Sequence, residues 1–169
     1  MQYMVLSALI TLAGINREML HVMEGILGIK RQTVVLENKP IVLRPPGITL
    51  RSKKPMKVIG PYVRVCLVLS TPARDGTPDQ QVRWFKEAMH GVKVGVTFKT
   101  KEGSAARTDA VTPSWYKFSR ISAKSEMDAC FSPRHKGTFA TGARMANIRV
   151  TVSAPLKVEG IYWESSNDD

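Results

Sequence analysis

The sequence predicts an α+β fold: a single domain with a twisted antiparallel sheet, a central amphipathic helix packed on one face of the sheet, and helices at the N-terminus. Three observations lead to this prediction. The stretch 62–98 follows the order strand, turn-rich loop, helix and strand; residues 147–153 alternate as a further strand; and apolar residues in 3–28 recur at helical spacing. A chain of 169 residues is long enough to bury a core without disulfides.

The central unit begins with a strand at 62–70 and continues into a helix at about 79–90. In the strand, one face is apolar and consists of Val63, Val65, Leu67 and Leu69. Asp79 stands where a helix N-cap or a first-turn acid is preferred, and Gly91 is well placed to end the helix. The apolar stripe of the helix consists of Val82, Phe85, Ala88 and Met89.

Two further strands, 92–98 and 147–153, complete the predicted sheet, because apolar and polar residues alternate in both. If these strands pair with 62–70, their apolar faces form one floor for the helix. The opposite face then projects four cations, namely Arg64, Lys93, Lys99 and Arg149. The sequence therefore predicts one core face and one basic face.

The N-terminal segment 1–28 is apolar enough to need separate treatment. Its first apolar run, 4–15, is shorter than the roughly 20 residues that span a bilayer. It also lacks the basic start of a secretory signal, since the first charged residue is Arg17. The segment is either a helical hairpin packed on the domain or a contact that buries itself in a neighbouring subunit or a lipid surface. For self-association we expect the side chains of Met4, Leu6, Leu9 and Leu12.

Segment 29–60 is basic and rich in proline, with eight Lys or Arg residues against the single acid Glu37. The whole chain has a net charge of +11 and a pI near 10.0, so a polyanionic partner is expected. The prolines favour an extended, exposed path with short strands at 32–36 and 41–43, and a solvated loop is the alternative. The cations predicted to bind a membrane or a nucleic-acid complex are Lys30, Arg31, Arg44, Arg51, Lys53, Lys54 and Lys57, with Arg134 and Lys136 from a later loop.

The remainder of the predicted core runs from 61 to 163 and is followed by an acidic tail at 164–169. Residues 99–114 are polar and are expected to form a loop, and a last strand is expected near 158–163. Between them, three aromatic residues lie among cations: Trp115, Tyr116 and Phe118. Such a run could stack on single-stranded RNA, anchor at a membrane, or form a half-buried strand, and we favour the strand.

No set of residues predicts catalysis, a metal or a cofactor, so we expect a binding or structural protein and not an enzyme. Cys66 reads as a small core residue within a strand, and Cys130 lies in a loop-like stretch. Two cysteines cannot hold zinc alone, and the histidines lie at no ligand spacing from them: His21, His90 and His135. A reducing compartment is therefore expected.

The order of an alternating strand, a proline-bearing loop, an amphipathic helix with an aromatic core residue, a second strand and a late strand NIRVTVS resembles the matrix proteins of rhabdoviruses. The likeness is greatest to the short matrix proteins of plant rhabdoviruses of the cytorhabdovirus type and covers roughly 60–153. It implies a structural protein of the virion that self-assembles between the nucleocapsid and the anionic envelope membrane, condenses the nucleocapsid and drives budding.

The resemblance also implies partners and a location. The partners are other copies of the chain, the viral nucleoprotein, an anionic membrane, the glycoprotein tail and, without sequence preference, RNA. The location is the virion beneath the envelope, and the host cytoplasm, inner membranes or nucleus. The alternative is a viral protein that binds single-stranded RNA without sequence preference, of the movement or silencing-suppressor type, with the aromatic run 115–118 as its stacking platform.

Overall fold

A computed structural model of the protein describes residues 28, 30–70, 77–89, 91–110, 115–118, 126–133 and 137–167. The chain divides into two compact units, Met1–Lys30 and Arg31–Asp169. Nearly all of the first unit lies outside the described residues, and so do the two helices expected in 1–28. All the described strands and the described helix belong to the second unit.

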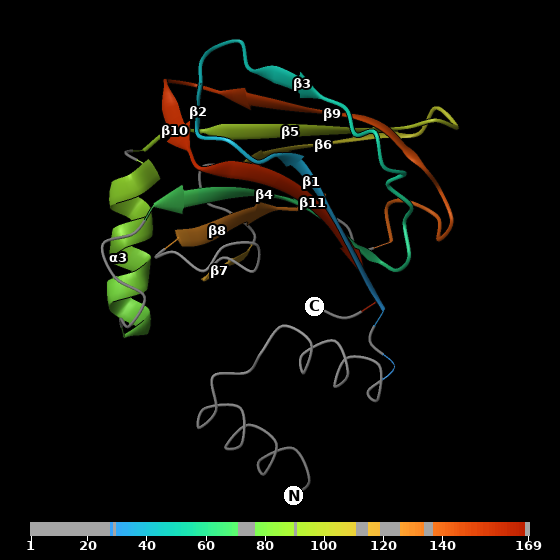
Figure 1. Ribbon diagram of the computed structural model, residues 1–169, viewed down its shortest axis with the longest axis horizontal. Coiled ribbons are helices and arrows are strands. Elements are labelled where there is room, and N and C mark those ends of the chain that lie inside the picture. Colours follow the sequence, from blue (N-terminus) through green and yellow to red (C-terminus); the bar gives the residue numbers. More distant parts are fainter. Residues whose placement is uncertain are drawn as a thin grey trace, which may run out of the picture. The chain divides into compact units, whose positions relative to one another are not determined.

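The second unit is built mainly from strands, so the predicted α+β class with helices is wrong. Its eleven strands form three antiparallel sheets, and α3 (Pro78–Met89) is the single helix among the described residues. The five-stranded sheet has the order β1 (Arg31–Glu37), β11 (Gly160–Ser166), β4 (Tyr62–Ser70), β8 (Glu126–Phe131) and β7 (Trp115–Phe118). The four-stranded sheet has the order β3 (Ile48–Leu50), β9 (Met145–Val152), β5 (Val94–Thr100) and β6 (Ala105–Ala110), and β2 (Ile41–Leu43) pairs with β10 (Leu156–Val158) (Figure 1).

The two larger sheets pack face to face around one hydrophobic core. Val65 of β4 and Trp163 of β11 belong to the same buried cluster as Val96 of β5 and Ile148 of β9. All four side chains are fully buried. Burial of an aliphatic side chain such as Val96 or Ile148 contributes about 1.5–3 kcal/mol to stability. The second unit is therefore a β-sandwich.

The predicted sheet of three strands is correct for two of them. β5 and β9 pair, with Val96 opposite Val150. β4 lies in the other sheet, between β11 and β8. The apolar face of β4 therefore meets the apolar faces of β5 and β9 across the core and does not continue them sideways. Alternation determines which side chains are buried, but it does not determine which sheet a strand joins.

Two segments far apart in the sequence form a ribbon that runs through all three sheets. Segment 31–50 contains β1, β2 and β3, and it pairs with β11, β10 and β9 of segment 145–166 in reverse order. Both segments therefore pass from one large sheet to the other through the β2–β10 pair. The expected short strands in the basic segment are confirmed, but its path is part of the sandwich and is not an exposed loop.

Helix α3 confirms the helix predicted at 79–90 but not its place on a sheet face. Its first turn is capped reciprocally, since the backbone N–H of Gln80 donates to Thr77 Oγ1 and that of Thr77 donates to Gln80 Oε1. Phe85 and Met89 are buried in the main core. Gly91, with a φ of 70°, follows the helix in the left-handed conformation expected for its C-terminal end. The helix stands at one end of the strands (Figure 1).

Three segments expected to be loops or tail belong to the sheets. β6 lies within the polar stretch 99–114, and β8 includes Cys130. The aromatic run forms β7, as favoured. β11 extends to Ser166, so Glu164 is a fully buried strand residue and not part of an acidic tail.

Cys66 and Cys130 form a disulfide, which the sequence did not predict. They lie directly opposite each other on β4 and β8, with their Cα atoms 4.0 Å apart. The bridge joins residues 64 positions apart, and restriction of the unfolded chain by a loop of that length corresponds to about 4 kcal/mol. Because disulfides persist in oxidising compartments, the pairing favours such a compartment over the reducing one expected.

Gly47 and Gly103 form a matched pair for testing how closely the β2–β3 turn approaches β9. Both have a φ of 96°. A Cβ atom at Gly47 would collide with the backbone of Val150 and Thr151, whereas at Gly103 it would meet nothing within 4 Å. Gly103→Ala should lower the free energy of unfolding by about 1 kcal/mol, from backbone conformation alone. Gly47→Ala should cost about 1–3 kcal/mol more, because the turn must also move away from β9. Urea unfolding measures both, and equal losses would contradict the close approach.

Candidate polyanion-binding surface

The outer face of the four-stranded sheet carries cations among short side chains. The alternation that buries Val96 and Ile148 turns the intervening residues of β5 and β9 outward. One row across the four strands consists of Thr49, Arg149, Thr97 and Arg107. The next row places Lys99 between Asn147 and Ala105.

We call Lys99, Arg107 and Arg149 the basic face, and all three are exposed. Arg107 and Arg149 are two strands apart, which corresponds to about 10 Å between their backbones. By its backbone, the register also places one acidic residue on this face, Asp109 of β6, opposite Gly95. The other residues that face outward here are short, so the face offers three separated cations beside one acid, and it can meet an array of anionic groups.

A second group of cations lies where β5 ends and β9 begins. Lys57, Lys101 and Arg144, which we call the basic end, are exposed. Lys57 forms an isolated bridge with Arg144, and the backbone N–H of Lys101 donates to the Arg144 carbonyl at 2.7 Å. Glu102 lies beside them, and hydrogen bonds from its own backbone N–H and from that of Arg144 lower the pKa of its carboxyl group. This end of the sheet thus carries three cations and one carboxylate, and the carboxylate interacts with Arg144.

The other predicted cations of the basic segment are dispersed. Lys30 precedes β1, and Arg44 begins the turn between β2 and β3; both are exposed. Three more, Arg51, Lys53 and Lys54, line a hollow beside β1. The described members of the predicted set therefore do not lie together on one surface, although Lys57 lies at the basic end beside Arg144.

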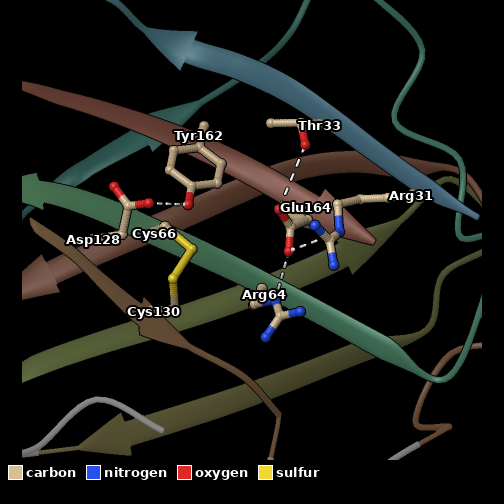
Figure 2. Close-up of a disulfide and its surroundings, with 8 residues drawn as sticks. All are labelled: Arg31, Thr33, Arg64, Cys66, Asp128, Cys130, Tyr162 and Glu164. Carbon is tan, nitrogen blue, oxygen red and sulfur yellow. Dashed lines mark hydrogen bonds and ion pairs between the residues drawn. A yellow bond between two sulfur atoms is a disulfide. The ribbon is translucent and has the colours of Figure 1, made fainter. Parts of the chain in front are cut away.

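Two arginines expected on basic surfaces pair with Glu164 instead; Arg64 is buried and Arg31 is partly buried (Figure 2). Arg64 of β4 is 2% exposed and its Nε lies 2.9 Å from Oε1 of Glu164, the residue opposite it on β11. Arg31 of β1 approaches the same oxygen at 3.8 Å, and the Thr33 hydroxyl lies 3.5 Å from Oε2. Removal of one partner of such a buried pair typically costs 3–5 kcal/mol, because the other charge is left uncompensated. These two arginines therefore join neighbouring strands through Glu164.

Beside this ion pair, Tyr162 and the disulfide continue the buried layer on the same face of the five-stranded sheet (Figure 2). The Tyr162 hydroxyl donates to Asp128 Oδ2 at 2.6 Å, and both residues are fully buried. Burial and the neighbouring Asp128 carboxylate raise the pKa of Tyr162 well above its usual value. Tyr162 is therefore a neutral hydrogen-bond donor at physiological pH.

Several predicted site residues lie outside the described part of the chain. These are the self-association residues Met4, Leu6, Leu9 and Leu12, and the loop cations Arg134 and Lys136. Trp115, Tyr116 and Phe118 are placed by their backbone alone, on β7 at the edge of the five-stranded sheet. The aromatic run and the basic face therefore belong to different sheets.

Sequence reasoning found Lys99 and Arg149 but missed Arg107, Lys101 and Arg144. Arg107 was missed because AARTDA at 105–110 lacks large apolar residues and reads as a loop. Its weak signal is the alternation of small residues, since Ala106 and Thr108 turn inward on either side of Arg107. Lys101 and Arg144 come together only through pairing of distant segments, which local patterns do not show.

Other functional features are absent from the described residues. None of their His, Cys, Asp and Glu side chains gather in threes as a metal site requires. Within the same part of the chain, no helix combines the length and apolarity needed to cross a bilayer. Comparisons with models of protein families, with curated proteins and with solved structures each found no match.

The raised pKa of Tyr162 predicts a specific loss of stability at alkaline pH. Folding favours the neutral phenol, so its contribution is complete below the unfolded-state pKa of about 10 and is lost as the pH rises above it. Between pH 9 and 11.5, roughly, the free energy of unfolding of the wild type should fall more steeply than that of Tyr162→Phe, by up to about 1.4 kcal/mol per pH unit. At neutral pH the variant should be less stable by about 1.5–3 kcal/mol, since it loses a hydrogen bond to a carboxylate. Parallel curves in urea unfolding across this range would contradict the assignment.

Proposed function

We propose that the protein is a structural protein that binds a polyanionic surface, and that this surface is an anionic membrane. The observation that supports the proposal is the basic face: Lys99, Arg107 and Arg149 are exposed on the outer side of a sheet, where the register places a single acid, Asp109. A lipid headgroup layer is itself a broad array of anions, so it can meet all three cations at once.

The strength of such binding follows from the number of cations. Each Lys or Arg near an anionic leaflet contributes about 1 kcal/mol. The basic face and the basic end together supply six, with Glu102 and Asp109 opposing them. About 4–6 kcal/mol corresponds to a dissociation constant from about 1 mM to tens of micromolar. A single copy therefore adsorbs reversibly, and assembly of many copies strengthens the attachment.

Single-stranded RNA fits this surface less well. Binding without sequence preference combines a basic groove with aromatic side chains on which the bases stack. The basic face has no aromatic residue among its described side chains, and the aromatic run lies on β7 of the other sheet. An RNA strand on the basic face would have charge contacts but no stacking platform.

The resemblance to rhabdovirus matrix proteins gives the proposal a specific form. In that form the chain assembles between nucleocapsid and envelope without enzymatic activity, with Met4, Leu6, Leu9 and Leu12 as contacts between copies. In this form of the proposal, the Cys66–Cys130 disulfide depends on the redox state of the compartment. In the host cytosol the two side chains would be thiols, and the bridge would form after the virion leaves it.

The proposal predicts that neutralising the basic face abolishes most membrane binding. Lys99→Gln, Arg107→Gln and Arg149→Gln together should weaken binding to vesicles of phosphatidylserine and phosphatidylcholine roughly 100-fold, from about 3 kcal/mol of lost attraction. Flotation across a salt series measures this, and wild-type binding should fall as salt rises. The matched control is Arg83→Gln, Lys86→Gln and Lys157→Gln, which removes the same charge from other exposed positions.

Two results would contradict the proposal. The first is equal loss of flotation in the two triple variants, which would show that net charge alone governs adsorption. The second is wild-type protein that ignores the vesicles and stays with added single-stranded RNA, which would favour the RNA-binding alternative.

A further inference from the structure

Strand β1 forms one edge of the five-stranded sheet and pairs, among the described strands, with β11 alone. An open edge has unpaired backbone N–H and C=O groups that can accept a further strand. Many peptide-binding domains use such an edge to bind an extended peptide as an added strand. Only those residues of β1 whose backbone groups point away from β11 can pair in this way.

The register of the sheet determines which residues of β1 these are. The Cα atoms of Cys66 and Cys130 are 4.0 Å apart, the short separation of a pair that exchanges no backbone hydrogen bonds. Cys66 therefore directs its backbone groups away from β8 and towards Tyr162, its partner on β11. Tyr162 then directs its own groups to β4, so Val35, opposite it on β1, directs its N–H and C=O to the open edge. By the same alternation Thr33 does so too, whereas Val34 bonds to Trp163.

A hollow of about 590 Å³ lies along this edge. Residues 33–36 form one side, and the chain after β3, residues 51–54, forms another. The side chain of Gln32 fixes the end of that loop to β1: its Nε2 donates to the Pro55 carbonyl at 3.2 Å, and its Oε1 accepts from the Lys57 backbone N–H at 2.8 Å. The backbone N–H of Lys54 also donates to Ser52 Oγ at 3.0 Å. These hydrogen bonds fix the loop 51–57 beside β1, so the hollow exists without a ligand.

The residues that line the hollow indicate which kind of ligand it can bind. Arg51, Lys53 and Lys54 line it and are exposed, and no acidic residue lines it. Val35, whose side chain is 47% exposed, adds an apolar contact. The hollow therefore has the backbone groups of an extended strand on one side and cations on the other. An extended peptide that carries carboxylates complements both.

We propose that this hollow binds an extended acidic segment of a partner protein, which adds to β1 as a sixth strand of the five-stranded sheet. Backbone hydrogen bonds to Thr33 and Val35 supply the pairing, and carboxylates of the segment meet Arg51, Lys53 and Lys54. The site shares no residue with the basic face or the basic end, so it is independent of the proposed membrane binding.

The probe for this site is a fluorescein-labelled peptide of eight residues in which glutamate alternates with threonine or valine. Fluorescence anisotropy with the full-length protein at low salt should show saturable binding. Arg51→Gln, Lys53→Gln and Lys54→Gln together should weaken it roughly tenfold, because exposed ion pairs contribute about 0.2–1 kcal/mol each. The control variant Arg83→Gln, Lys86→Gln and Lys157→Gln should bind as the wild type does.

A second variant tests the backbone pairing itself. Val35→Pro removes an N–H that points to the open edge and keeps the β11 pairing, so it should fold and lose the peptide. If this variant fails to fold, the wild type is tested with a peptide N-methylated at its four central amides, which cannot pair and should not bind.

Four results would overturn the proposal. A glutamine version of the peptide could bind as well as the acidic one, or the N-methylated peptide could bind as well as the unmodified one. The wild type could bind no peptide up to about 1 mM, in which case the cations only protect the edge from aggregation. Lastly, the protein could self-associate through an interface that Val35→Pro disrupts and that excludes the peptide, which would make the edge a contact between copies.

Discussion

The pairing of segment 31–50 with segment 145–166 is the constraint on which the rest of the sandwich depends. The three strands of one segment pair with the three of the other, and both cross between the large sheets at β2–β10. The two sheets are thereby joined by backbone hydrogen bonds as well as by the core. Glu164 adds specificity, because its buried carboxylate is matched by Arg64 on one neighbouring strand and by Arg31 and Thr33 on the other. A shifted register would leave this charge without its partners.

Because of this pairing, the cations of the chain lie in different environments and have different roles. Arg31 and Arg64 lie on the face of the five-stranded sheet opposite the sandwich core, where both pair with Glu164 and stabilise strand pairing. Lys99, Arg107 and Arg149 face outward from the four-stranded sheet and form the basic face. Arg51, Lys53 and Lys54 lie beside an open strand edge, where their charge acts together with backbone groups. Net charge alone predicts a polyanionic partner, but only the fold separates these three groups.

Local patterns predicted the individual elements well and their assembly poorly. Strict alternation identified β4, β5, β9 and β11, and a three-to-four spacing identified α3. The arrangement of strands in two sheets depends on pairings between residues more than a hundred positions apart, which leave no local signal. Arg64 and Lys99 illustrate the limit: both alternate with apolar residues, yet Arg64 is buried against Glu164 and Lys99 is exposed. The disulfide was missed for the same reason, because Cys66 and Cys130 meet only when β4 pairs with β8.

Hydrogen exchange of the backbone amides of β1, followed by NMR, tests the central pairing most directly. In the register described, Gln32 and Val34 bond to β11 while Thr33 and Val35 face the open edge. The account therefore predicts slow exchange at Gln32 and Val34, fast exchange at Thr33 and Val35, and slow exchange throughout the middle of β11, which is paired on both sides. Fast exchange along all of 31–37, or protection of Thr33 and Val35 with exposure of Val34, would contradict it.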